Sequence, residues 1–316
     1  MERDPLDPAS PDLPPPTRVR EFCRQILESG DLETKLRAPV DADGGPLSDS
    51  PSGPPLEIDR PARDPGLRMH SGSDRLPRPG QLRQTEHRIH CLARFAHHEL
   101  QAVELFAWAL LRWPELPAAL RRGLLSALAD EQRHCRLYLD RLEAQGGRFE
   151  TGDHSNYFWR QLPAIAASPS GPRAFLAAIG LTLEQANLDF TLTYRDGFAE
   201  AGDAESAAVC QLVHDDEVAH VALAARWLSR LNPNEREPDQ STPSDLGDYL
   251  AAVPFPLGPA RAKGRRFEVA PRRRAGLSEE MIQHVRLARS TQEQGIASGP
   301  PKTADPKTRD PEQPEG

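Results

Sequence analysis

The segment HDDEVAHVALAARWL, residues 214–228, carries Glu217 and His220 three positions apart. Side chains three positions apart on an α-helix leave the same side of it. Val221 and Leu228 fall on that side as well, so the segment predicts a helix whose apolar face includes a carboxylate and an imidazole. Burying an unpaired carboxylate is costly, so the pattern indicates that these side chains are paired or bind a metal.

The same pair occurs in ADEQRHCRLYLDRL, residues 129–142, and each pair follows a lone Glu at a similar distance. From Glu99 to Glu131 is 32 residues, and from Glu184 to Glu217 is 33. Four-helix bundles that hold two metal ions take one Glu from each of two helices and a Glu-x-x-His from each of the other two. The predicted metal ligands are Glu99, Glu131, His134, Glu184, Glu217 and His220.

Four helices are expected around these residues. Residues 82–112 contain no Gly or Pro, and apolar positions recur there every three or four residues. Similar patterns predict helices at about 117–144, 173–200 and 204–231, with all six residues on apolar faces. The segment 145–172, rich in Gly, Pro and Ser, is a long crossover between the second and third helices. The predicted fold class is therefore all-α, a four-helix bundle with a long crossover.

The prolines divide the chain into three parts. Fifteen of the 32 prolines lie in residues 1–80 and twelve in 231–316. We expect an N-terminal extension over 1–80 with one short helix at about 18–36, and the bundle over 81–232. Residues 233–316 are expected to form a largely irregular C-terminal extension with a basic stretch and a disordered end.

Composition argues against several classes of function. The net charge of −8 disfavours nucleic-acid binding by the whole chain. The basic stretch 258–274, with seven Arg or Lys against one Glu, leaves an RNA contact as an alternative to an intramolecular arm. The four Cys are far apart, which suggests neither a zinc ribbon nor a disulfide framework and fits a reducing cytoplasm. We expect a cytoplasmic protein with no secretory signal and no membrane segment.

The ligand types indicate which metal would bind. Four carboxylates neutralise two divalent ions, and two imidazoles add neutral nitrogen donors; this set suits iron or manganese. We expect two iron ions, with manganese or a mixed Mn/Fe pair as alternatives. We further expect Glu131 and Glu217 to bridge the ions, each His to bind one ion, and the two lone Glu residues to be terminal ligands.

Other polar residues near the motifs leave alternatives open. Glu104 lies about 140° further round the helix than Glu99, so only one of them can face the site squarely, and the apolar stripe favours Glu99. Glu104 is expected either to hold a ligand side chain in place or to contact a neighbouring helix. His214 is a candidate to hold a ligand carboxylate, while Asp130 and Asp216 are candidates to orient a facing His. Whether Glu104 or His214 joins the ligands is open at this point.

Four segments together resemble a known family. They are HHELQAVEL at 97–105, ADEQRHCRLYLDRL at 129–142, LEQANLD at 183–189 and HDDEVAHVALAARWL at 214–228. They are similar to a family of bacterial ferritin-like proteins defined only as domain of unknown function 455, over about residues 80–230. The resemblance implies a ferritin-like fold and a di-iron or related dimetal centre, with ligand positions that fall on the six residues named above. It implies no particular reaction.

These observations lead to an expected function. We expect an oxygen-activating oxidoreductase that uses dioxygen and an unknown small-molecule substrate. The alternatives are a ferroxidase or iron-handling protein, and a non-catalytic scaffold or binding module. Association into a homodimer is left open.

Overall fold

The computed structural model describes residues 13–50, 52–72, 75–231 and 245–289. The described chain is mainly helical, which confirms the predicted all-α class. The end of the chain that was expected to be disordered lies outside these residues. Among the described helices, none combines the length and apolar character needed to span a membrane.

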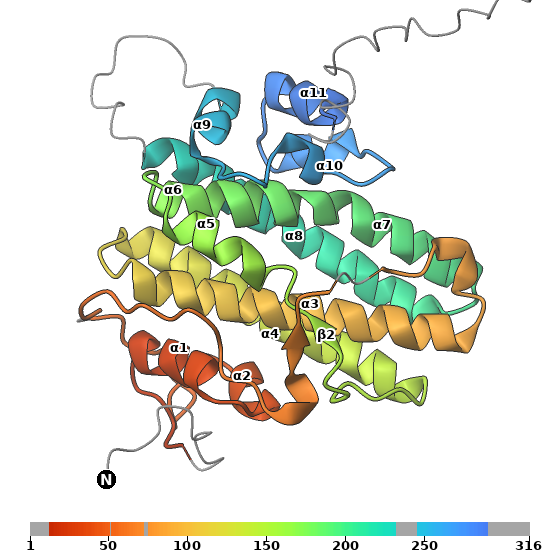
Figure 1. Ribbon diagram of the computed structural model, residues 1–316, viewed down its shortest axis with the longest axis horizontal. Helices are drawn as coiled ribbons and strands as arrows, with labels where there is room; N and C mark the ends of the chain where they lie inside the picture. The colour runs from red at the N-terminus through yellow and green to blue at the C-terminus, as the bar shows by residue number, and fades with distance from the viewer. Residues whose placement is uncertain (1–12, 51, 73–74, 232–244, 290–316) are drawn as a thin grey trace, which may run out of the picture.

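Four long helices form the centre of the described structure (Figure 1). They are α3 (Thr85–Arg112), α4 (Ala118–Ala144), α7 (Gln185–Glu200) and α8 (Ala204–Arg230). Helix α3 packs against α4, α7 packs against α8, and α4 joins the two pairs through its contact with α8. The bounds of α3, α4 and α8 lie within three residues of those expected from the apolar periodicity.

The segment before α7 departs from the expected regular helix. It begins as α6 (Pro172–Phe175) and continues as a π-helix, η4 (Leu176–Glu184), which ends at one of the predicted ligands. A π-turn adds a residue to the turn and is often found at functional sites. Apolar periodicity did not predict it, because every residue of η4 is buried and no polar side of the helix is left to mark the turn.

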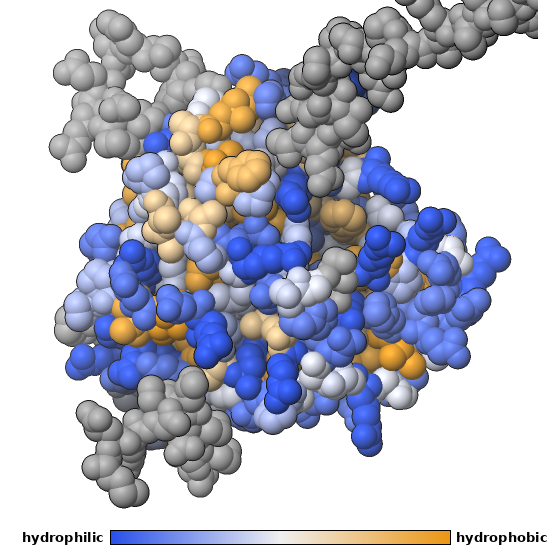
Figure 2. Space-filling model, in the orientation of Figure 1, coloured by the Kyte–Doolittle hydropathy of each residue, from blue (hydrophilic) through white to orange (hydrophobic). Residues whose placement is uncertain are grey.

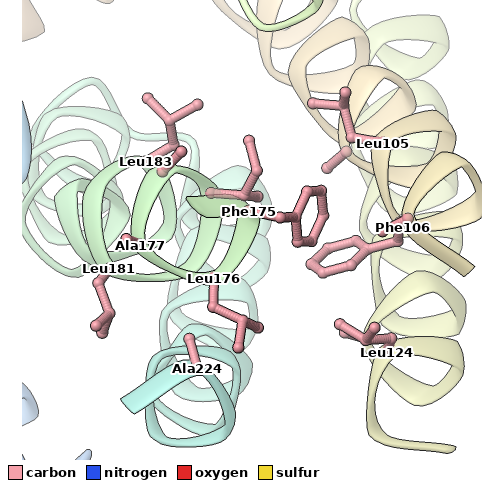
Figure 3. Packing of buried hydrophobic residues seen from close by; sticks show 14 of the residues in the cluster. Leu105, Phe106, Leu124, Phe175, Leu176, Ala177, Leu181, Leu183 and Ala224 are labelled. Atoms are coloured by element: carbon pink, nitrogen blue, oxygen red, sulfur yellow. The ribbon is translucent and has the colours of Figure 1, made fainter. Parts of the chain in front are cut away.

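Gly180 explains how η4 can lie so close to α8. A Cβ atom at this position would be 2.2 Å from the Cβ of Ala224, so the two backbones approach as closely as they do because Gly has no side chain. Figure 3 shows the packing here, with Ala224 of α8 next to Leu176 of η4. It also shows Phe175 and Phe106 facing each other; their ring centroids are 5.8 Å apart.

The crossover between α4 and α6 is partly ordered by the N-terminal extension. It contains β2 (His154–Ser155), η3 (Trp159–Gln161) and α5 (Leu162–Ala166). Strand β2 pairs in parallel with β1 (Met69–His70). The crossover is therefore held by a segment that lies far from it in the sequence.

The first part of the N-terminal extension, with α1 and α2, lies along the lower side of the molecule in Figure 1. Its helices are α1 (Val19–Glu28), which packs on α3, and α2 (Leu32–Leu36), which contacts α3 and α4. Two 3₁₀ turns, η1 (Pro65–Leu67) and η2 (Pro79–Gln81), follow before α3 begins. The single helix expected at about 18–36 is thus two helices separated by a break at Ser29–Asp31.

The described part of the C-terminal extension is more helical than expected. It forms α9 (Asp245–Ala252), η5 (Pro259–Arg261), α10 (Val269–Arg274) and α11 (Glu279–Leu287). Helices α9 and α10 pack on α8. Their apolar residues, among them Tyr249, join the main hydrophobic core, which stabilises helices that are too short to be stable alone. Figure 2 shows hydrophobic residues gathered near α9 and hydrophilic residues over most of the same face.

Arg272 anchors this extension to α7. Its guanidinium donates two hydrogen bonds to the carboxylate of Asp189, at 2.7 and 2.9 Å, and both side chains are fully buried. At this residue the basic stretch is an intramolecular arm, as the sequence suggested.

Two apolar cores occupy opposite ends of the long helices. One includes Val103–Leu111 of α3 and Leu120–Leu128 of α4. The other includes Cys91, Leu92, Ala96 and Leu100 of α3 and Cys135, Tyr138 and Leu142 of α4. The predicted ligands lie in the middle, where the two cores meet.

Candidate metal centre

The structure brings the six predicted ligands together in the interior. Glu99 comes from α3, Glu131 and His134 from α4, Glu184 from the end of η4, and Glu217 and His220 from α8; none is more than 6% exposed. Their donor atoms form two groups, and within each group the atoms all lie within 4.8 Å of one another. Glu131 belongs to both groups. The groups are Glu131, Glu184, Glu217 and His220, and Glu99, Glu131 and His134.

Several of these atoms converge without bonding to one another. His220 Nδ1 lies 3.0 Å from Glu131 Oε1, 3.4 Å from Glu217 Oε2 and 3.8 Å from Glu184 Oε2. Within the described chain, none of these four buried atoms has a hydrogen-bond partner. Unpartnered oxygen and nitrogen atoms aimed at a common point are what a bound cation requires, and carboxylate with imidazole suits iron or manganese. The donor set therefore fits the metals inferred from the sequence.

Positive charge between the buried carboxylates would also stabilise them. Burial raises the pKa of Glu99 well above its ordinary value, and the nearby charge of Glu131 adds to the effect. Burial likewise raises the pKa of Glu217, with a further contribution from Glu184. Four carboxylates packed this closely repel one another, and cations between them would reverse that cost.

Glu131 differs from the other two carboxyls because it has imidazole partners. Burial acts to raise its pKa, but the nearby imidazoles of His134 and His220 outweigh burial and lower it. Burial acts to lower the pKa of His220, yet its carboxylate neighbours, Asp130 first, raise it well above the ordinary value. The centre of the site is thus arranged to keep Glu131 ionised.

Two Asp residues brace the imidazoles across the α4–α8 interface. Asp216 Oδ2 lies 2.9 Å from His134 Nε2, and Asp130 Oδ2 lies 3.4 Å from His220 Nε2. Each Asp therefore orients the His of the neighbouring helix, as the sequence predicted. Arg133, which sequence reasoning missed, donates to both carboxylates at 2.8 and 2.9 Å and so ties the two pairs together.

This bracing determines which imidazole nitrogen faces the site. An ionised carboxylate only accepts hydrogen bonds, so Nε2 of each His must carry the proton. The hydrogen bond from His134 lowers the pKa of Asp216, which keeps that carboxylate ionised. Nδ1 of His134 and of His220 therefore faces the carboxylates, and it can bind a metal once it carries no proton.

Asn187 is a second residue that sequence reasoning missed. Its Nδ2 donates to Glu217 Oε1 at 2.8 Å and so orients that carboxylate. The signal was present in LEQANLD, because Asn187 lies three residues after Glu184 on the same side of the helix. His214 had been the candidate for this role; it contacts Thr191 Oγ1 at 3.1 Å and belongs to neither ligand group.

Glu104 also lies outside both ligand groups. Lys35 Nζ is 2.9 Å and Arg63 2.7 Å from its carboxylate, and Trp159 Nε1 donates to it at 2.8 Å. Burial acts to raise the pKa of Glu104, but Arg63 and Lys35 outweigh burial and lower it. Lys35 belongs to α2, so Glu104 makes the contact with a neighbouring helix that the sequence suggested, while Arg63 and Trp159 add partners from the N-terminal extension and the crossover.

The sequence predicted that Glu131 and Glu217 each bridge the two metal ions. The membership of Glu131 in both groups is the arrangement expected of a bridging ligand. Glu217 is grouped with His220 and not with His134, so its role as a second bridge stays a prediction.

A cavity of about 310 Å³ reaches the centre from one side. Glu99 is the predicted ligand that lines it. On the other side, next to Glu184 and His220, there is a void of only about 10 Å³. Access for a molecule larger than water is therefore on the Glu99 side.

Comparisons with known proteins place the chain in a family. Residues 23–283 match the family model described as "Protein of unknown function (DUF455)". No curated protein and no solved structure matched the chain. The match includes the long helices, all six predicted ligands and most of both extensions, so the chain belongs to the DUF455 family.

Proposed function

We propose that the four long helices form a ferritin-like bundle that holds two metal ions, foremost iron, and that the protein is an oxygen-activating oxidoreductase. One observation carries the proposal: six buried side chains from four helical segments converge in two groups that share Glu131. A bundle with two metal ions requires one Glu from each of two helices and a Glu-x-x-His from each of the other two. When bound, two iron ions would supply the redox chemistry that activates dioxygen towards an organic substrate.

The residues of the chain would perform the binding and positioning. Nδ1 of each His and the four carboxylates would hold the ions, with Asp130 and Asp216 orienting the imidazoles. Asn187 would keep the Glu217 carboxylate directed into the site. The apolar cores on both sides would limit the access of water, and the cavity beside Glu99 would admit the substrate.

The cavity favours oxidation of an organic molecule over simple handling of iron. At about 310 Å³ it is large enough for a small organic molecule. Handling of iron alone requires a path for an ion, and a pocket lined mainly by apolar groups does not provide one. The proposed partners are therefore dioxygen and a small-molecule substrate.

Metal loading tests the proposal. The full chain, loaded with ferrous iron without oxygen and then desalted, should retain about two ions per chain. Glu131→Ala should retain about none, since this residue is shared by both groups. Glu86→Ala, which removes an exposed carboxylate from α3, should load as the wild type does.

Oxygen consumption then separates the alternatives. Oxygen uptake that requires an added cell extract of small molecules supports the proposal. Catalytic turnover of ferrous iron without an organic molecule would identify a ferroxidase instead. Retention of fewer than about one ion per chain would refute the dimetal centre.

A further inference from the structure

The cavity beside Glu99 has the lining of a binding site for an apolar group. Apart from Glu99, its inner wall includes Phe95, Tyr138, Leu183 and Ala186. Phe95 and Tyr138 pack against each other with ring centroids 5.2 Å apart, so the aromatic part of the wall is fixed in place. A volume of about 310 Å³ lies at the lower end of the range for small-molecule pockets.

Two arginines lie at the wall of the same cavity and converge on one tyrosine. The guanidinium of Arg160 lies 5.0 Å from the centre of the Tyr157 ring, and Arg261 donates to the Tyr157 hydroxyl at 2.8 Å. Arg160 and Arg261 come from η3 and η5, segments about 100 residues apart that the fold brings together. The hydrogen bonds of these guanidinium groups among the described residues go to uncharged oxygens, the Ser71 carbonyl for Arg160 and the Tyr157 hydroxyl for Arg261.

Basic residues continue beyond this cavity. An adjoining cavity of about 580 Å³ shares Leu76 and Phe190 with the first. Its other lining residues include four cationic side chains, Arg75, Arg78, Lys263 and Arg265. Two of them, like Arg261, belong to the basic stretch at 258–274. On a chain with a net charge of −8, this concentration of positive charge beside one opening favours the approach of anions.

We propose that the cavity binds an organic anion with an aromatic or similarly apolar body. The body would lie against Phe95 and Tyr138, beside Glu99, and the anionic group would bind Arg160 and Arg261. Two guanidinium groups favour a carboxylate or a phosphate, because each can donate paired hydrogen bonds to it. That this anion is the substrate rests on the proposed function. Its binding in the cavity does not, because the binding requires only residues of the chain.

Direct binding tests the charge requirement. The full chain is titrated by calorimetry with naphthalene-2-carboxylate, 2-naphthyl phosphate and the neutral naphthalene-2-carboxamide. At least one of the two anions should bind about tenfold more tightly than the amide, and comparing the two identifies the preferred head group. Equal affinity for the amide and both anions would contradict the role of the arginines, and absence of binding by all three would overturn the proposal.

Paired variants locate the site. Arg160→Gln with Arg261→Gln should reduce binding of the preferred anion to about the level of the amide and leave the amide unchanged. The control, Arg122→Gln with Arg226→Gln, removes the same charge from exposed positions that do not line the cavity and should bind as the wild type does. Ala186→Phe should abolish binding of both compounds by filling the cavity; unchanged binding by this folded variant would place the ligand elsewhere.

Metal loading keeps the two proposals separate. The Arg160/Arg261 variant should retain as much iron as the wild type, because neither residue belongs to a ligand group. Anion binding without any iron retention would refute the dimetal centre and leave the anion site. Full iron retention without anion binding would refute the anion site and leave the dimetal centre.

Discussion

The geometry of the candidate centre depends on single polar contacts that reach across helix interfaces. Asp216 holds the imidazole of His134, and Asp130 holds that of His220, each from the opposite helix. Arg133 contacts both carboxylates, so the positions of the two imidazoles are coupled. Such residues bind no metal themselves, yet they determine the direction of the lone pairs that do.

Replacement of Asp216 by Asn should weaken metal binding by about 10- to 100-fold, because the His134 ring loses the charged acceptor that orients it. The measurement is competition for ferrous or cobaltous ion against a chelator of known affinity. Asp216 is part-buried, and its removal also takes one of the two partners of Arg133.

The neighbouring Asp215 provides the control. It is exposed and lies outside both ligand groups, so Asp215→Asn removes the same charge without removing a partner of His134 or His220. The assignment of Asp216 would be contradicted if the two variants bound the metal equally well.

At the scale of secondary structure, the π-helix η4 has the greatest effect on the site. It ends at Glu184, and its path along α8 brings this carboxylate to 3.8 Å from His220 Nδ1. The Thr182 hydroxyl donates to the carbonyl of Ala177 at 2.8 Å, five residues back, and also lies 2.8 Å from the Tyr249 hydroxyl of α9. The wider turn is thus supported by the C-terminal extension as well as by its own backbone.

Gly180→Ala should destabilise the fold by about 1–3 kcal/mol, because the added methyl group would overlap the side chain of Ala224. The free energy of unfolding in urea measures the effect. Iron loading of this variant should also decrease if the methyl group displaces η4 and with it Glu184.

Two further variants test the cause. Ala224→Gly in the Gly180→Ala background removes the overlapping methyl group and should recover part of the lost stability. Gly80→Ala places a methyl group where no atom lies within 4 Å and should be close to neutral. Destabilisation of equal size in both single Gly variants would refute the explanation by close packing.

At the scale of the whole molecule, the two extensions are joined to the central helices by buried ion pairs. Lys35 and Arg63 of the N-terminal extension meet Glu104 of α3, and Arg272 of the C-terminal extension meets Asp189 of α7. Removing one partner of a buried pair leaves the other charge without compensation. The extensions are therefore integral parts of the fold.

Glu104→Gln should lower the free energy of unfolding by about 3–5 kcal/mol at neutral pH, because two cationic side chains lose their shared carboxylate. The pKa of Glu104 is lowered in the folded protein relative to its ordinary value of 4.5. The folded state therefore binds the Glu104 proton more weakly than the unfolded chain does. Stability from this group is present above the ordinary value and is lost as pH falls through the lower, folded-state pKa.

The difference in unfolding free energy between the wild type and Glu104→Gln should accordingly shrink as the solution is acidified below pH 4.5. Glu115→Gln, which changes an exposed carboxylate in the loop between α3 and α4, should show no such difference at any pH. A difference that grows on acidification would contradict the ion-pair explanation.

The sequence by itself determined the all-α class, the bounds of most of the long helices and the choice of Glu99 over Glu104 on the apolar stripe. These features follow from the spacing of apolar residues along a single helix, which is a local property and can be read directly from the sequence. The sequence also suggested that Asp130 and Asp216 orient the His of the facing helix, because each directly precedes a motif Glu.

Only the tertiary structure decided the rest. The π-turn before Glu184, the contact of Asn187 with Glu217, the partners of Glu104 and the cavity between Phe95 and Arg261 depend on segments that are distant in sequence. The spacing of apolar residues shows which side of a helix is buried. It does not show which side chain of another element will contact that side. Those partners are set when the helices pack, because only then do the two sides of each contact exist.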